Sequence, residues 1–123
     1  MQNVLVIEDN PVMLSSIVYI LNKDGYNVLT AKDGREAFEM IDNATYDVVI
    51  TDLLLPYANG LEVVNKIRKN SANMNVGTMV ISSAGNEEMI SQAFQLGADD
   101  FLQKPISSDQ LLSRIKKMVA NIS

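Results

Sequence analysis

Cysteine and histidine are both absent from this chain of 123 residues. Without cysteine the chain can form no disulfide, no thiolate metal site and no thiol nucleophile, which fits a reducing compartment. Without histidine it lacks the side chain that titrates nearest neutrality and any imidazole base for a catalytic triad. A site in this protein must therefore be built from other polar groups.

Long apolar runs and a basic charge balance are also missing. No apolar run approaches the ~18 residues that suggest a membrane span, and the amino terminus lacks the pattern of a signal peptide. The net charge of −5 argues against nucleic acid as the main ligand. With 47 % apolar and 20 % charged residues, the composition is typical of one globular domain, 1–123. We expect a cytoplasmic domain with no membrane partner.

Short apolar segments alternate with longer helical patterns five times along the chain. Three of the segments are nearly continuous in β-branched or aliphatic residues, as strands are when helices cover both faces of a parallel sheet. The five predicted strands are Val4–Ile7, Tyr26–Leu29, Val48–Ile50, Thr78–Ile81 and Phe101–Leu102.

Helix-capping residues mark where the five intervening helices are expected to begin. Asn10 is followed by a proline, and Asp33, Asn59 and Ser107 each have a glutamate or glutamine three residues later. Asn86 is expected to cap the fourth helix. The pattern predicts an α/β fold: a doubly wound (βα)₅, flavodoxin-like domain with a five-stranded parallel sheet. We expect the strand order 2-1-3-4-5, which is common for such folds, although periodicity alone does not determine it.

Polar residues follow four of the five predicted strands. In a doubly wound sheet, ligands bind beyond the carboxyl ends of the strands, where the strand order reverses, so these residues are expected to meet there. They are Glu8 and Asp9 after the first strand, Asp52 after the third, Ser82 and Ser83 after the fourth, and Lys104 after the fifth.

The three carboxylates define the chemistry of this edge. Placed together they repel one another, unless a cation joins them or one takes up a proton. Mg²⁺ suits such a site because it is a hard ion held by carboxylates, water and phosphate oxygens. With the charge of Lys104 and a serine hydroxyl, the set fits a phosphoryl group. Asp52 can be the nucleophile, because an aspartate can become an acyl phosphate and a rigid strand holds it still.

Four motifs, in this order, resemble the receiver domain of bacterial response regulators. They are "VLVIEDN", "VITDLLLPYANGLEVVNKIR", "VISSAG" and "GADDFLQKP". Any one of them would be a weak signal, but the ordered set is specific and covers essentially the whole chain.

The resemblance implies a role for each acidic residue. Asp52 would be the phospho-acceptor. Mg²⁺ (or Mn²⁺) would be held by Glu8, Asp9, Asp52 and the backbone carbonyl of Leu54, with Asp9 as a direct ligand and Glu8 acting partly through water. Glu8 stands where aspartate is more usual in the family.

The resemblance also implies the residues that respond to the phosphoryl group. Ser83 and Lys104 would stabilise it; Ser83 precedes an alanine as the family's hydroxyl residue does, and Ser82 is the weaker candidate. Ser83 and Phe101 would form the switch, with Phe101 in place of the usual tyrosine and so without a phenolic hydroxyl. The peptide bond between Lys104 and Pro105 would be cis.

The implied function is phosphorelay signalling. A histidine kinase or phosphotransfer protein would phosphorylate Asp52 and thereby change the surface of the fourth helix, fifth strand and fifth helix. That surface would control an output partner and can also form a homodimer. The chain would catalyse only its own phosphorylation and dephosphorylation, so it would not be an enzyme in the ordinary sense. It would be either a free-standing receiver or the first part of a longer regulator.

Three other functions compete with this interpretation. A phosphorylation-independent interaction module would have no need of the acidic residues, Ser83 and Lys104. An aspartyl phosphohydrolase would place a second carboxylate two residues after the nucleophile, where this chain has Leu54. A flavodoxin would need a phosphate loop rich in hydroxyl groups and glycine, where this chain has "EDNPVM".

Overall fold

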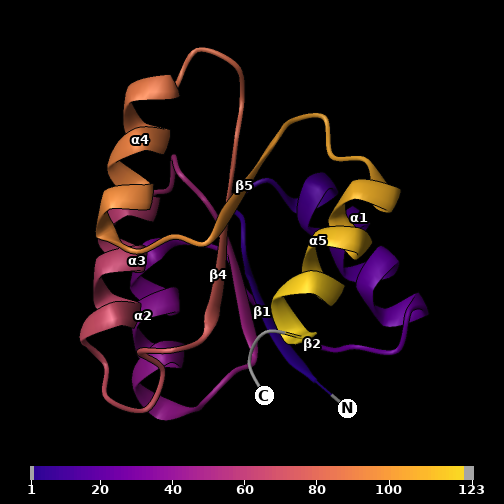
Figure 1. Ribbon diagram of the computed structural model, residues 1–123, viewed down its shortest axis with the longest axis horizontal. Helices are drawn as coiled ribbons and strands as arrows, with labels where there is room; N and C mark the ends of the chain where they lie inside the picture. The colour runs from indigo at the N-terminus through magenta and orange to yellow at the C-terminus, as the bar shows by residue number, and fades with distance from the viewer. Residues whose placement is uncertain (1, 121–123) are drawn as a thin grey trace.

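Five strands alternate with five helices along residues 2–120, the part of the chain that the computed structural model describes (Figure 1). None of these helices is long and apolar enough to cross a membrane. In chain order the elements are β1 (Asn3–Ile7), α1 (Pro11–Lys23), β2 (Asn27–Ala31), α2 (Gly34–Asn43), β3 (Val48–Asp52), α3 (Gly60–Lys69), β4 (Gly77–Ser82), α4 (Glu87–Leu96), β5 (Asp100–Gln103) and α5 (Ser108–Ala120).

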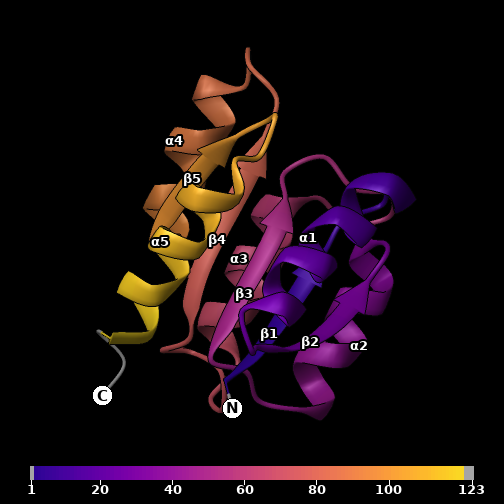
Figure 2. The ribbon, with the colours of Figure 1, turned by 90° about the vertical axis from the view of Figure 1, so that its right-hand side faces the viewer.

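The strands form one parallel sheet in the order β2-β1-β3-β4-β5, which confirms the predicted fold class and strand order. Figure 2 shows the five strands side by side. Helices α1 and α5 cover one face of the sheet, and α2, α3 and α4 cover the other (Figure 1). All five predicted strands overlap observed ones. The largest difference is in β2, which begins one residue later than predicted and continues through Thr30 and Ala31, because these residues pair with the end of β1.

Both faces of the sheet are buried, which explains the continuous apolar strands. Along β1, Val4 and Val6 belong to the core cluster that contains the inner residues of α1 and α5. Leu5 and Ile7 belong to the cluster on the opposite face, with the inner residues of α2 and α3. Each of these four side chains is fully buried. Two-sided packing holds the strands rigidly, and therefore also the residues at their carboxyl ends.

Most of the predicted helix caps are present. The Asn10 side chain accepts hydrogen bonds from two backbone N–H groups of α1, and Asp33 accepts one from α2. Asn59 forms a complete capping box with Glu62. The Ser107 hydroxyl accepts a hydrogen bond of 3.4 Å from the backbone N–H three residues later.

The prediction for Asn86 was wrong. This residue lies at the N-cap position of α4, but its side chain makes no capping hydrogen bond. Its amide nitrogen donates instead to the Ser82 hydroxyl and to the Ser83 carbonyl. The backbone conformation (φ −112°, ψ 30°) is not the extended one that an N-cap usually adopts. The side chain therefore donates from its nitrogen to two acceptors at the end of β4, and its oxygen accepts no hydrogen bond from the first turn of α4.

Candidate functional site

The carboxyl edge of the sheet gathers the acidic residues that the sequence singled out. Asp52 is the last residue of β3, and Glu8 and Asp9 follow the neighbouring strand β1. One carboxylate oxygen from each of the three lies within 4.8 Å of the others. Glu8 and Asp52 are buried, while Asp9 is exposed to solvent. The edge therefore presents a cluster of three carboxylates that solvent reaches from the side of Asp9.

Asp52 is fixed in place by the close packing of α3 against the end of β3. The backbone N–H of Gly60 donates to the carbonyl of Leu53 at 2.8 Å. A Cβ at Gly60 would overlap the backbone carbonyl of Asp52, so a glycine is required for this approach. The backbone N–H of Leu54 donates to Asp52 Oδ1 at 3.3 Å. Asp52 is thus held from its backbone and from one carboxylate oxygen.

Lys104 follows β5, the outermost strand of the sheet, and its side chain extends along the carboxyl edge to the acidic cluster. Its Nζ lies 2.7 Å from Asp52 Oδ2 and 3.2 Å from Glu8 Oε1. Burial lowers the pKa of this ammonium group, but its hydrogen bond to Asp52 and the negative charges of Asp52 and Glu8 outweigh that effect and raise the pKa above its ordinary value. The bond between Lys104 and Pro105 is cis, the isomer that the resemblance implied. Lys104 is therefore a fixed positive charge beside Asp52.

Glu8 is a buried carboxylate with unused binding capacity. Its Oε2 accepts a hydrogen bond of 3.1 Å from the backbone N–H of Asn10. Its Oε1 is buried and has no hydrogen-bond donor; Lys104 approaches it only as an ion-pair partner. Burial raises the pKa of the Glu8 carboxyl from 4.5 to about 7, and the charge of Asp52 adds to the rise, although the Asn10 N–H and Lys104 oppose it. A buried carboxylate of this kind is a natural ligand for a hard cation.

The two serines after β4 have different surroundings. Ser82 is 1 % exposed, and its hydroxyl donates to the carbonyl of Ser83 at 3.0 Å. Ser83 is exposed and follows the last residue of the strand. The backbone of Ser82 also accepts a hydrogen bond of 2.8 Å from the N–H of Lys104. The end of β4 is therefore connected directly to the residue that carries the ammonium group.

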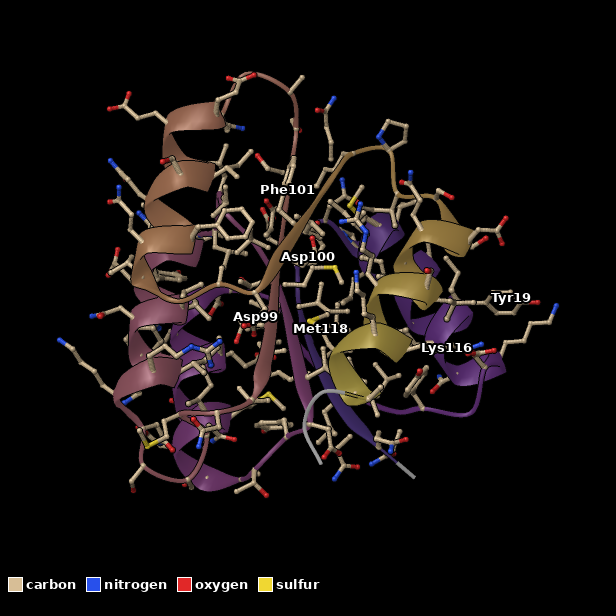
Figure 3. The ribbon with its side chains drawn as sticks, viewed as in Figure 1. Tyr19, Asp99, Asp100, Phe101, Lys116 and Met118 are labelled. Atoms are coloured by element: carbon tan, nitrogen blue, oxygen red, sulfur yellow. The ribbon has the colours of Figure 1, made fainter. Side chains whose placement is uncertain are left out.

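Phe101 lies on β5, between α4 and α5 (Figure 3). It is half-buried and packs against a small core cluster that includes Val80 and Ala93. Leu54, two residues after Asp52, is 56 % exposed at the rim of the acidic cluster. One residue that the sequence interpretation assigned only as a cap is part of this edge: Asn86. The sequence offered one sign of this role, which is the pair of serines three and four residues before Asn86. Their hydroxyl and carbonyl groups can bind the Asn86 side chain and so turn it away from the helix.

The fold and this edge together define a class of protein: a doubly wound α/β domain whose strand ends unite carboxylates, an ammonium group and hydroxyls. The comparison with known families is in agreement. The model of the response regulator receiver domain matches residues 4–116, and the chain belongs to this family. It is therefore a receiver domain of two-component signalling, which transmits signals through phosphorylation. Receiver domains are in general signalling modules rather than enzymes.

Individual relatives support the same assignment. The response regulator RR06 of Streptococcus pneumoniae serotype 2 (strain D39) is 34 % identical over 117 residues, which cover 95 % of this chain and 52 % of that protein. The chain thus spans about half the length of this curated relative. The receiver domain of the Francisella response regulator 1452 has a TM-score of 0.90 at 28 % identity, with all of both chains covered.

A second solved structure shows a metal in this type of domain. The receiver domain of the sensor histidine kinase PA1611 from Pseudomonas aeruginosa PAO1 has a TM-score of 0.88 at 27 % identity, covering 97 % of this chain and 98 % of that one. That protein has a magnesium ion coordinated in its active-site cleft.

Proposed function

We propose that Asp52 accepts a phosphoryl group from the phosphohistidine of a histidine kinase or phosphotransfer protein. The observation that carries the proposal is the convergence of the carboxylates of Glu8, Asp9 and Asp52 within 4.8 Å, with Lys104 Nζ 2.7 Å from Asp52. These 123 residues contain no histidine, so the donor imidazole lies outside them.

The transfer uses Asp52 as the nucleophile. A carboxylate oxygen attacks the phosphorus atom, and a P–O bond forms as the P–N bond of the donor breaks. The electron pair of the broken bond stays with the donor imidazole, which takes up a proton. Lys104 remains beside the new acyl phosphate and stabilises the negative charge on its oxygens. The exposed Ser83 hydroxyl supplies a further hydrogen bond to that group.

Mg²⁺ fits the donor atoms of this edge. The candidate ligands are the carboxylates of Glu8, Asp9 and Asp52 and the backbone carbonyl of Leu54, all of them oxygens that the ion prefers. The buried Glu8 Oε1, which has no hydrogen-bond donor, supports the assignment. When bound, the ion neutralises the charge that accumulates on the phosphoryl oxygens. It also relieves the mutual repulsion of the three carboxylates.

Phosphorylation then biases an existing equilibrium between two conformations. Ser83 moves toward the phosphoryl group, Phe101 turns inward, and the surface of α4, β5 and α5 changes. This surface acts on an output domain or protein and can pair two copies of the chain. Phe101 is suited to the change because it is half-buried at the junction of β5 with a small cluster beneath α4.

The test is phosphorylation by a small phosphodonor, followed by intact mass. The wild type should gain one phosphoryl group in the presence of Mg²⁺ and none after chelation. Asp52→Asn should gain none. Asp109→Asn, an equal loss of charge at an exposed position of α5, should behave as the wild type.

Two results would contradict the proposal: an unmodified wild-type protein, or a modification that persists in Asp52→Asn. If Mg²⁺ also failed to bind saturably, a phosphorylation-independent interaction module would be the better explanation.

A further inference from the structure

Asn86 connects the first turn of α4 to the end of β4 through its side-chain amide. The Nδ2 atom donates to the Ser82 hydroxyl at 2.9 Å and to the Ser83 carbonyl at 3.2 Å. The Ser82 hydroxyl donates to the same carbonyl at 3.0 Å. Three hydrogen bonds thus close a ring among Ser82, Ser83 and Asn86, which we call the Asn86 tether.

The tether uses the property that separates asparagine from aspartate, the residue most similar to it in shape and in capping. Asn59 occupies the same position of α3, and there the side-chain oxygen accepts a hydrogen bond from Glu62 N at 3.0 Å. An aspartate could do this equally well, because asparagine and aspartate are similar N-caps. Asn86 acts instead through its NH₂ group, which aspartate lacks. Its identity therefore matters for donation and not for capping.

The tether acts on the hydroxyl residue at the rim of the acidic cluster. The carbonyl of Ser83 receives two donors, while the Ser83 side chain is exposed. The same Ser82 accepts the backbone N–H of Lys104, so one residue connects both groups assigned to the phosphoryl oxygens. Beyond Ser83 the loop continues through Gly85, where φ is +95° and a Cβ would meet nothing within 4 Å. The loop has room to move if the tether opens.

We propose that the Asn86 tether restrains Ser83 in its exposed position in the unphosphorylated protein. This inference rests on the proposed function, because it assumes that the Ser83 hydroxyl moves toward a phosphoryl group on Asp52. The movement rotates the peptide group of Ser83, and its carbonyl then loses the Asn86 donor. The phosphoryl group thus works against the tether, and a variant without the tether favours the inward form beforehand. Loss of one ordinary hydrogen bond corresponds to a change of about fivefold in that equilibrium.

Two variants open the tether in different ways. Asn86→Asp removes the donor and keeps an oxygen that can cap α4, and Ser82→Ala removes the bridging hydroxyl. Asn59→Asp is the matched control, since it adds the same charge at another N-cap on the same edge of the sheet. The probe is beryllofluoride, a phosphoryl analogue, titrated at saturating Mg²⁺ and followed through the backbone amide NMR signals of residues 83–88.

The half-saturating concentration should fall about fivefold in Asn86→Asp and in Ser82→Ala. It should stay within about twofold of the wild type in Asn59→Asp, which keeps its capping bond. The half-saturating concentration of the double variant should fall further than that of either single variant, because each single change leaves one of the two donors to the Ser83 carbonyl. Unchanged or raised concentrations in both single variants would overturn the inference.

The proposed function and the tether can fail separately. If wild-type Asp52 neither accepts a phosphoryl group nor responds to beryllofluoride, the proposed function fails and the inference about Ser83 movement fails with it. If the wild type responds and the tether variants do not differ from it, only the tether fails. Unfolding free energies of the two single variants and the double variant test the ring itself, since additive losses would show that Ser82 and Asn86 are not coupled.

Discussion

Two buried polar side chains at opposite edges of the sheet, Asn73 and Glu8, differ in how their polar atoms are bonded. At the amino edge, Asn73 is 2 % exposed and its side chain is fully bonded: Oδ1 accepts from Tyr46 N, and Nδ2 donates to the carbonyls of Ile41 and Ala44. At the carboxyl edge, Glu8 is 1 % exposed, and its Oε1 accepts no hydrogen bond and has only the ion pair with Lys104 Nζ at 3.2 Å. Equal burial thus gives a satisfied group at one edge and an unsatisfied one at the other.

This difference in hydrogen bonding indicates different roles for the two edges of the sheet. A satisfied buried group stabilises the fold, because its hydrogen bonds replace those lost from water. An unsatisfied one costs stability unless a ligand completes it, and clustered carboxylates add repulsion to that cost. The buried amide at the amino edge therefore stabilises the fold, and the buried carboxylate at the carboxyl edge fits the cation and phosphoryl site that we propose there.

Replacement of Arg68, at the end of α3, should have the largest effect on the stability of the domain. Its guanidinium donates to the carbonyls of Gly97, Val76 and Met74, at distances from 2.6 to 3.2 Å. These bonds join α3 to the loops before β4 and β5. The ion pair with Asp99 adds little, because that carboxylate is 49 % exposed. Arg68→Ala should lower the free energy of unfolding by about 3 kcal/mol, measured in urea.

The comparison of the two edges also predicts that Arg68→Ala leaves the phosphorylation of Asp52 unchanged. Because Arg68 lies at the amino edge, the folded fraction of the variant should still accept a phosphoryl group at the wild-type rate. Lys69→Ala removes the neighbouring exposed positive charge and should change stability by less than about 0.5 kcal/mol. If Arg68→Ala kept the wild-type stability, or if its folded fraction failed to accept a phosphoryl group, the two edges would not differ in function as we infer.

The contribution of Glu8 to the free energy of unfolding should be smaller than that of Arg68 and should depend on pH. In the metal-free protein its pKa is about 7, against an ordinary value of 4.5. Between these values the folded state holds a proton that the unfolded state has released, so stability must fall as pH rises through this window. The loss should be about 2 kcal/mol from pH 5 to pH 7, given at most about 1.4 kcal/mol per pH unit for one proton. Urea unfolding in the presence of a chelator measures it.

Glu8→Gln is the control for this pH dependence. The amide cannot titrate, so the difference in stability between variant and wild type should vary with pH as the linkage predicts. Added Mg²⁺ should stabilise the wild type increasingly above pH 7, because the ion binds the ionised carboxylate. A wild-type curve parallel to that of Glu8→Gln between pH 5 and 7 would show that the buried carboxyl does not take up the proton.

The sequence predicted those features that depend on one-dimensional pattern and on parallel topology. The continuous apolar run of β1 indicated a strand buried on both faces, and the shared carboxyl edge brought Glu8, Asp52 and Lys104 together. What a side chain bonds to is decided by three-dimensional competition. Asn86 has the sequence of a cap, and only the position of the Ser82 hydroxyl shows why it does not act as one.

Backbone strain is likewise hidden from the sequence. Among the described residues, Tyr57 is the one non-glycine with positive φ, at 72°. It follows a proline and precedes an alanine, so no glycine or asparagine indicates the conformation. The Ala58 N–H donates to the Pro56 carbonyl across it at 2.9 Å, and the Arg35 guanidinium lies 4.0 Å from the centre of its ring. The loop after Asp52 thus stores strain at the same edge that leaves Glu8 unsatisfied.

The smallest predicted change in stability comes from two variants of Tyr57. Comparing them distinguishes the backbone strain at this residue from the packing of its aromatic ring. Tyr57→Ala and Tyr57→Gly both remove the contact with Arg35, but only glycine relaxes a positive φ. The glycine variant should therefore be more stable than the alanine variant by about 1 kcal/mol. In the body of α4 the order reverses, and at the exposed Gln92 the glycine variant should be less stable than the alanine variant by about 1 kcal/mol. Equal stability of the two Tyr57 variants in urea would show that the loop is unstrained, and strain would then no longer distinguish the carboxyl edge from the helices around it.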